Sequence, residues 1–533
     1  MQIANTCALH VTHSVITKGG ASISACRYTD AVPMTQLLKT KSIDEMVEET
    51  HVEGKRLKRS LGPLSLIAFG IGAVIGSGIF TVTGTAAAGQ TFEVKSIFNA
   101  PVLDLLIHGG KAASTIGRPG AGPGVVVSFI LVAVACGFAG LCYAELASMI
   151  PVAGSAYTYA YTTLGEIFAW IIGWDLILEY AVSNMSVAVG FSAYSNDVCD
   201  FFFKGHHLPT ALSVPAIIDW HATGSYFNVP AFAVVLVLSW ILVQGIKESA
   251  ETNSLLVAIK LLAILIFVFG AAHAIKPQNW HPFLPNGYSG LLTGGAIIFF
   301  TYIGFDSISC AAEETRNPQR DMPIGIFGTL LVCALLYASV ALVLTGIVNW
   351  KTLTGDAPVA DALKQLAMNK LGAVVNVGAL LGMISSLLVY QYGQARVWFA
   401  MSRDRLLPDM FSKVHKKHQT PHVSTWVAGF VVAIPSGLFT VAFFANLANI
   451  GTLFAFVLVS FGVIVLRRKE PNRYRAFRVP GAPFTPLISV ACCLLLMLGL
   501  PLETWIRFFF WLIIGLFIYF LYSRKRSPLH QVS

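Results

Sequence analysis

Long apolar segments separated by short polar loops fill the sequence from residue 61 to residue 523. A helix rises 1.5 Å per residue and the hydrocarbon core of a bilayer is about 30 Å thick, so each segment is of a length to cross a membrane. Twelve spanning helices are predicted on this basis, at 61–88, 122–148, 166–198, 228–248, 253–274, 289–312, 324–348, 371–401, 423–441, 446–466, 483–501 and 504–523. The third and the eighth exceed the bilayer thickness, and we expect them to tilt or to extend beyond it.

The first apolar segment concentrates glycine at its centre. Residues 64–84 read LSLIAFGIGAVIGSGIFTVTG, and each interior glycine costs a helix about 1 kcal/mol relative to alanine. Two interpretations are open. Gly72 and Gly76 form a small-xxx-small pair that lets another helix approach closely. Alternatively, the helix breaks at Gly76-Ser77-Gly78 and exposes backbone N–H and C=O groups to a polar ligand at mid-depth.

The sixth segment has a similar interruption. Gly304 lies in its middle, and Asp306 follows two residues later. A carboxylate at that depth costs about 2.5 to 3.5 kcal/mol on insertion scales and usually faces a cavity or a partner, although an interhelical hydrogen bond would also satisfy it. Two glycine-interrupted spans at corresponding places in two halves of five spans indicate a transporter whose binding site lies between the breaks. The predicted fold class is an all-α polytopic membrane protein.

Composition agrees with this class. The chain has 533 residues, 55% of them hydrophobic and only 12% charged, with a mean hydropathy of +0.68, which excludes an ordinary soluble globular protein. Its nine cysteines show no CxxC or metal-ligand spacing and indicate neither redox nor zinc chemistry. The net charge of +9 comes from basic residues in short loops, where membrane topology accounts for them, so we exclude nucleic acid as a partner.

The distribution of lysine and arginine predicts the orientation. With strict alternation from a cytoplasmic N-terminus, the inward loops hold about 21 basic residues and the outward loops about nine. We therefore expect a multi-pass protein of the cytoplasmic (plasma) membrane with both termini in the cytoplasm. The expected organisation is a soluble, mobile N-terminal tail at 1–54, a transmembrane domain at 55–525 and a cytoplasmic tail at 526–533. A Gly- and Pro-rich insertion at 89–121 separates the first two spans.

Five motifs in order carry a family resemblance that covers nearly all of residues 55–525. They are GIGAVIGSGIF at 70–80, YAELASMIPVAGSAYTYAY at 143–161, GWDLILEYAV at 173–182, GFDSISCAAEETRNPQRDMPIGI at 304–326 and YGQARVWFAMSRDRLLP at 392–408. The chain resembles the cationic amino acid transporter family of the amino acid-polyamine-organocation superfamily. The resemblance implies a leucine-transporter-like fold with two inverted repeats of five helices. The chain departs from the family in its 89–121 insertion, and it ends after about twelve spans where animal members have fourteen.

A broken first span would suit the two charged groups of an L-amino acid. The N-terminus of its second half, at Ser77, Gly78 and Ile79, offers free N–H groups and the positive end of a helix dipole to the substrate carboxylate. Carbonyls at the ends of the first halves would receive the ammonium. By similarity to the family, these carbonyls belong to Val74, Phe300 and Ile303, beside the breaks at Gly76 and Gly304. The resemblance also makes Phe300 a gate over the substrate and puts Asp306 and Tyr390 at the border of the side-chain pocket.

Lys260 in the fifth span is the candidate for proton coupling. It lies eight residues from Thr252, or about 12 Å along the helix axis. One interpretation is that its side chain reaches the membrane interface. The other is that its ammonium meets carbonyls near Gly70 and Ala73 and the face of the eighth span, where sodium-coupled members of this fold bind their ion. The resemblance favours the second, because proton-coupled relatives carry lysine at the matching position. Protons would then be the coupling ion, with no other cofactor and no metal.

Other charged residues are assigned less directly. Asp175 and Glu179 lie four residues apart and share a helix face, and we favour a structural or cytoplasmic-gate role for them over substrate contact. A group near the predicted cytoplasmic ends is interpreted as solvated ion pairs: Glu145, Glu166, Glu313, Glu314 and Arg396. The loop histidines His206, His207 and His221 are interpreted as surface residues.

We predict a secondary active permease that imports L-amino acids by proton symport with alternating access. Alternatives remain: an exchanger subunit linked by a disulfide at Cys199 to a single-span membrane partner, or a uniporter selective for cationic amino acids. An intramembrane enzyme lacks support because no span carries a GxSxG or HExxH motif. A metal-ion transporter would need carboxylate, Asn and Met ligands at both breaks, and the first offers none. The bulk of Tyr390 favours small or neutral amino acids over Arg and Lys.

Overall fold

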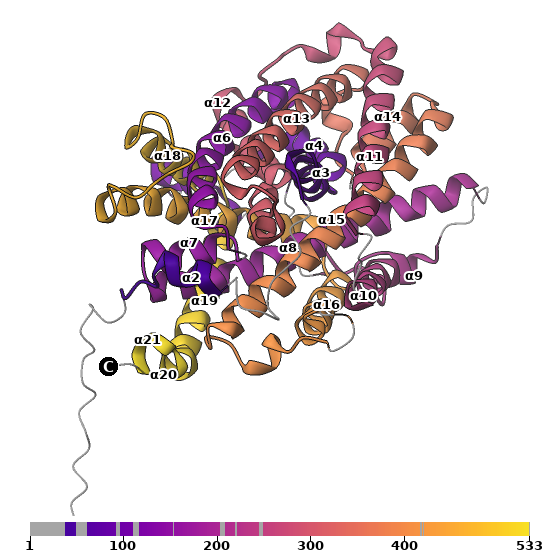
Figure 1. The fold of residues 1–533 in the computed structure, drawn as a ribbon. Helices are drawn as coiled ribbons and strands as arrows, with labels where there is room; N and C mark the ends of the chain where they lie inside the picture. Colours follow the sequence, from indigo (N-terminus) through magenta and orange to yellow (C-terminus); the bar gives the residue numbers. More distant parts are fainter. Residues whose placement is uncertain are drawn as a thin grey trace, which may run out of the picture.

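The computed structural model describes residues 38–49, 61–91, 96–109, 117–152, 154–202, 208–218, 221–244, 249–355, 357–415, 418 and 420–531. This part of the chain is a helical bundle (Figure 1). Its α-helices are α2 (Ile43–Glu49), α3 (Pro63–Val74), α4 (Gly78–Ala88), α5 (Val102–His108), α6 (Val125–Met149), α7 (Ala156–Thr163), α8 (Glu166–Phe202), α9 (Thr210–Ser213), α10 (Val229–Gln244), α11 (Ser249–Ala271), α12 (Gly287–Ile298), α13 (Pro318–Ile347), α14 (Pro358–Gln365), α15 (Asn369–Arg403), α16 (His422–Ser436), α17 (Val441–Lys469), α18 (Phe484–Leu498), α19 (Leu502–Ile518), α20 (Arg524–Arg526) and α21 (Pro528–Gln531). The strands are short: β1 (Gly89–Thr91) pairs with β2 (Gly117–Pro119), and β3 (Ile217–Ile218) pairs with β4 (His221–Ala222), both antiparallel.

The apolar helices correspond to the twelve predicted spans. Within the described ranges, eight helices are long and apolar enough to cross a membrane, and the pair α3 and α4 qualifies as one span bent by 49°. Three shorter apolar helices, α10, α16 and α18, account for the rest. The polytopic all-α fold predicted from the sequence is confirmed.

Proline sets two boundaries that hydropathy misplaced. Helix α13 begins at Pro318, six residues before the predicted start at 324, because proline is preorganised for a first helical turn even when polar residues follow. Helix α16 ends at Ser436, directly after Pro435, although the apolar run continues to 441.

Helices five spans apart pack against each other. The second span, α6, packs on the seventh, α13; the third, α8, on the eighth, α15; and the fourth, α10, on the ninth, α16. The first span contacts the sixth in the same way, through α4 with α12 and α3 with the segment after it. This pairing of counterparts is what two intertwined repeats of five helices produce. Figure 1 shows α3 and α4 inside the bundle, where α3 contacts α11, α13 and α15.

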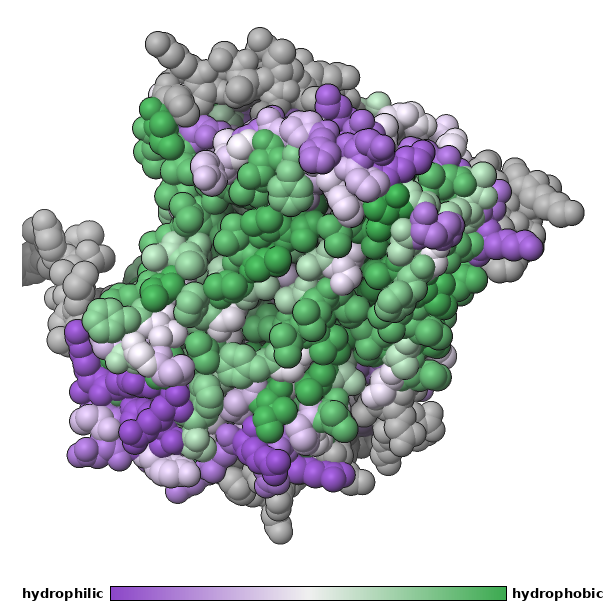
Figure 2. Space-filling view, turned by 90° about the horizontal axis from the view of Figure 1, so that it is seen from above, coloured by the Kyte–Doolittle hydropathy of each residue, from purple (hydrophilic) through white to green (hydrophobic). Residues whose placement is uncertain are grey.

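An apolar band crosses the surface of the bundle. Figure 2 shows hydrophobic residues across the middle of the face in view, with hydrophilic residues concentrated toward opposite edges. Large apolar side chains such as Leu131, Phe269 and Phe517 are exposed, at 56%, 75% and 65%. A soluble protein would bury such residues, whereas lipid accommodates them.

The described part of the predicted insertion packs on the bundle. Strands β1 and β2 join its two ends. Between them, Pro101 forms a bridge with Pro501, and the Val102 N–H donates to the Leu500 carbonyl at 3.1 Å. The insertion therefore lies against the loop that connects α18 and α19.

The end of the predicted N-terminal tail also packs on the bundle. Residues 1–37 and 50–60 lie outside the described part. Helix α2 buries Ile43 and Met46, and the Lys41 N–H donates to the Tyr161 carbonyl at 3.2 Å. Residues 38–49 thus behave as a cap on this face and not as a free segment.

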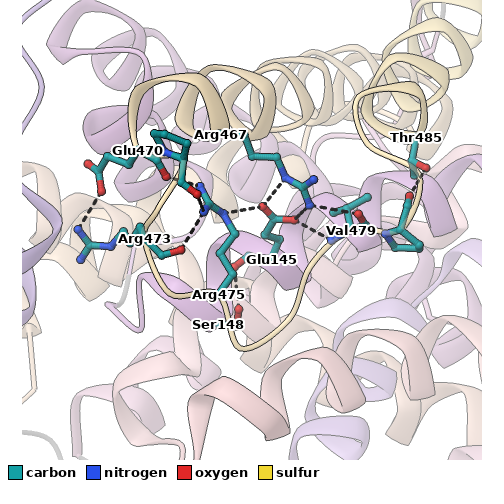
Figure 3. Close-up of polar contacts among 10 residues, drawn as sticks. Glu145, Ser148, Arg467, Glu470, Arg473, Arg475, Val479 and Thr485 are labelled. Atoms are coloured by element: carbon teal, nitrogen blue, oxygen red, sulfur yellow. Dashed lines mark hydrogen bonds and ion pairs between the residues drawn. The ribbon is translucent and has the colours of Figure 1, made fainter.

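Glu145 lies in a buried ionic cluster on the face expected to be cytoplasmic (Figure 3). Its side chain is 1% exposed and accepts hydrogen bonds from Arg467 at 2.9 and 2.6 Å and from the Val479 N–H at 2.7 Å. Arg475 adds an ion pair at 3.3 Å. Glu166 is also buried, and it accepts a hydrogen bond from the Tyr519 hydroxyl at 2.9 Å.

The interpretation of these two glutamates as solvated ion pairs is wrong. Both carboxylates are buried, because surrounding donors replace water around them. An ion pair does form between Glu314 and Arg396, 2.7 Å apart, but it is mostly buried, with side chains 22% and 19% exposed.

Candidate functional site

The first span is broken where its glycines predicted. Helix α3 ends at Val74 and α4 begins at Gly78, and Ile75 has φ −82° and ψ 78° between them. The first residues of a helix have no intrahelical acceptor for their N–H groups, so Gly78 and Ile79 present free donors at the start of α4. Gly76 also permits close packing, because a Cβ there would lie 3.2 Å from the Ser386 side chain. Both interpretations of the glycines therefore hold.

The sixth span is broken as well. After α12, a short 3₁₀ helix η6 runs over Phe299–Tyr302, and a second, η7, over Phe305–Glu314. Gly304 joins them with φ +115°, in the left-handed region that side chains rarely adopt. The predicted pair of breaks is present.

The two breaks face each other at close range. A Cβ on Gly78 would lie 3.0 Å from the Thr301 backbone, and a Cβ on Gly304 would lie 3.0 Å from the Ala73 side chain. Because both residues lack a side chain, the backbones of the first and sixth spans come into contact here. The free N–H groups of α4 therefore lie beside the carbonyls of the sixth span.

Tyrosine hydroxyls bind two of the three carbonyls assigned to the substrate ammonium. The Tyr337 hydroxyl lies 2.9 Å from the Val74 carbonyl, and the Tyr390 hydroxyl donates to the Ile303 carbonyl at 3.0 Å. The Phe300 carbonyl accepts the Ile303 N–H at 3.4 Å. Each carbonyl oxygen has two lone pairs, so each retains capacity for a second donor such as an ammonium.

Three carboxylates are buried inside the bundle, and one of them, Asp306, follows the sixth-span break. Asp306 is 1% exposed and accepts a hydrogen bond from Tyr180 at 3.0 Å. Glu179, next to Tyr180, and Asp175 have no hydrogen-bond partner for either carboxylate oxygen among the described residues. Gly451 makes room for Asp175, since a Cβ there would lie 2.7 Å from its Oδ1. All three side chains come from spans that line the breaks or pack on them.

Lys260 lies inside the bundle. It is 0% exposed, and its ammonium donates to the Gly72 carbonyl at 2.9 Å and to the Ile75 carbonyl at 2.8 Å. The Ser386 hydroxyl of α15 reaches the same two oxygens at 2.7 and 3.1 Å. The interpretation that Lys260 reaches the membrane interface is wrong. Its ammonium joins the C-terminal end of α3 to the fifth span, and Ser386 joins the same end to the eighth span.

Three contributors to this arrangement were not selected from the sequence. Ser386 has a sequence signal, because it belongs to a Ser-Ser pair within an apolar span. Tyr180 and Tyr337 lie in the middle of their spans, but their partners are set by helix packing, which the sequence pattern does not show.

Comparison with known proteins identifies the family. A family model described as amino acid permease matches residues 61–520. The chain belongs to the amino acid permease family. This membership agrees with the resemblance to the amino acid-polyamine-organocation superfamily, and the related proteins are transporters and not enzymes.

Several relatives cover almost the whole chain. It is 45% identical to a branched-chain amino acid permease (BcaP) of Bacillus subtilis over 93% of this chain and 99% of that protein. It is 40% identical to a methylthioribose transporter of Bacillus subtilis over 93% of this chain and 100% of that protein. A third relative is the chloroplastic cationic amino acid transporter 9 of Arabidopsis thaliana, 34% identical over 85% of this chain and 76% of that protein.

Proposed function

We propose that this permease imports neutral L-amino acids by proton symport across the plasma membrane, with branched-chain amino acids as the first candidates. The observation that carries the proposal is the pair of facing breaks. Free N–H groups at Gly78 and Ile79 suit a carboxylate, and the carbonyls of Val74 and Ile303 suit an ammonium. An L-amino acid presents both groups on one carbon, so a single ligand can bridge the two spans.

The preference for neutral side chains rests on the residues around Asp306. Tyr180 already binds this carboxylate, and the Tyr390 ring lies 6.3 Å from the Tyr180 ring, centroid to centroid. A long cationic side chain would have to displace these aromatic groups to reach the carboxylate. The 45% identity to a branched-chain amino acid permease agrees with a neutral substrate.

Proton coupling rests on Lys260. Its ammonium supplies charge and donors to the Gly72 and Ile75 carbonyls, which would otherwise be available to a metal cation. Loss of the proton would remove that charge and weaken the contact between α3 and α11. Protonation can therefore be linked to movement of the cytoplasmic half of the first span.

Uptake into proteoliposomes tests the proposal. Purified protein is assayed with labelled L-isoleucine, L-alanine, L-arginine and methylthioribose, with and without an inward proton gradient and in sodium-free buffer. We expect L-isoleucine to accumulate with the gradient and without sodium. Accumulation of methylthioribose alone would contradict the amino acid assignment, and a sodium requirement would contradict the coupling.

The exchanger alternative has its own test. Cys199 near the end of α8 is partly exposed and free in this single chain. A disulfide to a single-span partner would change mobility on a non-reducing gel of native membranes. We expect unchanged mobility, together with uptake into vesicles that hold no internal amino acid.

A further inference from the structure

Arg118 is a buried cation at the end of the insertion. It lies in β2, outside the spans, and is 2% exposed. Burial lowers the pKa of its guanidinium from 12.5 to about 10, so it remains charged at neutral pH. A buried charge normally has a partner of opposite sign.

Arg118 has only neutral partners among the described residues. Its Nη1 donates to Gln90 Oε1 and to Asn446 Oδ1, both at 3.2 Å, and its Nη2 donates to the Gly499 carbonyl at 3.3 Å. Its Nε has no hydrogen-bond partner, and no carboxylate lies within ion-pair distance in the described part of the chain. The guanidinium thus retains capacity to bind an anion.

A small cavity adjoins these partners. It has a volume of about 30 Å³, and its lining includes Gln90, Asn446, Thr81 and Thr85. That space suits roughly one water molecule and not an amino acid. The cavity lies between α4, α12 and α17, so separation of these helices would enlarge it.

A polar stripe on α4 joins this cavity to the predicted substrate seat. Ser77, Thr81 and Thr85 are spaced four residues apart and so share one helix face. Thr85 and Thr81 line the cavity, and Ser77 lies at the break. The cavity residues Thr81 and Thr85 follow Ser77 by four and eight residues, or about 6 and 12 Å along the helix axis.

We propose that Arg118, with Gln90 and Asn446, forms an outer site that binds the α-carboxylate of an incoming amino acid before it passes along α4 to the break. This inference rests on the proposed function, because a substrate without a carboxylate would gain nothing from the site. It adds a second, earlier point of recognition at the opposite end of α4 from the seat.

The same contacts explain why the site is closed here. Arg118 joins the insertion, α17 and the loop after α18 through neutral acceptors. A carboxylate forms shorter and stronger bonds to a guanidinium than amide oxygens do. Arrival of the substrate carboxylate therefore competes with the contacts that hold these elements together, and it favours the open arrangement.

Sided transport measurements test the outer site, with L-isoleucine as probe. Membrane vesicles of both orientations compare entry from the side that holds Arg118 with entry from the opposite side. For Arg118→Met we expect KM to rise about 10-fold from the Arg118 side, as loss of a charged hydrogen bond implies, and to stay within about twofold from the other side. Arg118→Lys should recover part of this loss. Lys351→Met, which removes an exposed cation from η8 (Trp350–Thr352), is the matched control and should leave both values unchanged.

A second variant separates recognition from a purely structural role and serves if Arg118→Met fails to fold. Asn446→Asp places a carboxylate where Nη1 already donates. As a resident competitor it should raise KM from the Arg118 side about 10-fold. If Arg118 only holds the helices together, Asn446→Asp leaves that KM unchanged and Arg118→Met leaves it unchanged or lowers it; either result overturns the proposal.

Failure of the outer site and failure of the proposed function are distinguishable. If the wild type transports L-isoleucine and the variants keep their KM from the Arg118 side, only the proposal of the outer site is refuted. If the wild type transports no amino acid from either side, both the proposed function and the outer site are refuted.

Discussion

At the scale of single residues, the two glycines at the breaks are positions where an added side chain would be crowded. Gly78 faces the Thr301 backbone, which cannot move as a flexible side chain can. Valine at 78 would also restrict the backbone that presents the carboxylate seat. We expect Gly78→Val to reduce uptake roughly 10-fold or more while the protein still inserts, as measured by transport per amount of membrane protein.

Gly137→Val is the matched control for Gly78→Val. It makes the same substitution in α6, where nothing lies within 4 Å of the added Cβ. Normal transport by both variants would refute the assignment of the break as the substrate seat.

Tyr390 tests selectivity at the same scale. Its hydroxyl binds the Ile303 carbonyl and its ring faces Tyr180. Removal of the ring in Tyr390→Ser should open space toward Asp306 and strengthen inhibition of uptake by L-arginine about 10-fold in competition assays. Tyr390→Phe keeps the bulk and should leave the inhibition as weak as in the wild type. A wild type that already prefers L-arginine to L-alanine would contradict this idea and leave the transporter assignment intact.

At the scale of elements, the sequence predicted what depends on local pattern. Twelve spans followed from apolar length, and both breaks followed from glycine clusters, because these properties belong to a single segment. Contacts between different segments could not be predicted from the sequence pattern. The ammonium of Lys260 was expected near Gly70 and Ala73 but binds the Gly72 and Ile75 carbonyls, since the rotation of α3 against α11 is set by packing. The burial of Arg118 likewise depends on contacts between segments, and no local pattern indicated it.

The cluster around Glu145 links elements that the sequence could not pair. It ties the end of α6 to α17 and to the loop before α18. Glu145→Gln would leave Arg467 and Arg475 without a counter-charge, at a cost of about 2 kcal/mol once the partial exposure of Arg467 is discounted. We expect a lower apparent Tm for the purified variant in detergent. Glu503→Gln, at a partly exposed pair with Arg507, is the control and should change Tm less; equal shifts in both variants would refute a special role for the cluster.

At the scale of the whole molecule, the coupling role proposed for Lys260 would link the coupling ion to the transport cycle. It holds the C-terminal end of α3 to α11, and Ser386 holds the same end to α15, so three spans meet at two carbonyl oxygens. The seat at Ser77 and Gly78 lies on the other side of the break. The proton would therefore act on the α3 side of the first-span break and the substrate on the α4 side. Binding of both at one break would couple them.

Substitution of Lys260 by methionine should separate coupling from binding. We expect wild-type uptake to rise as external pH falls and to ignore sodium. Lys260→Met should lose accumulation driven by a pH gradient while L-isoleucine still raises the Tm of the purified protein, because the substrate seat does not include the ammonium. Lys370→Met, which removes an exposed cation near the start of α15, should keep normal pH dependence. A Lys260→Met variant that still accumulates substrate against its gradient with normal pH dependence would refute the coupling role, because another residue would then have to carry the response.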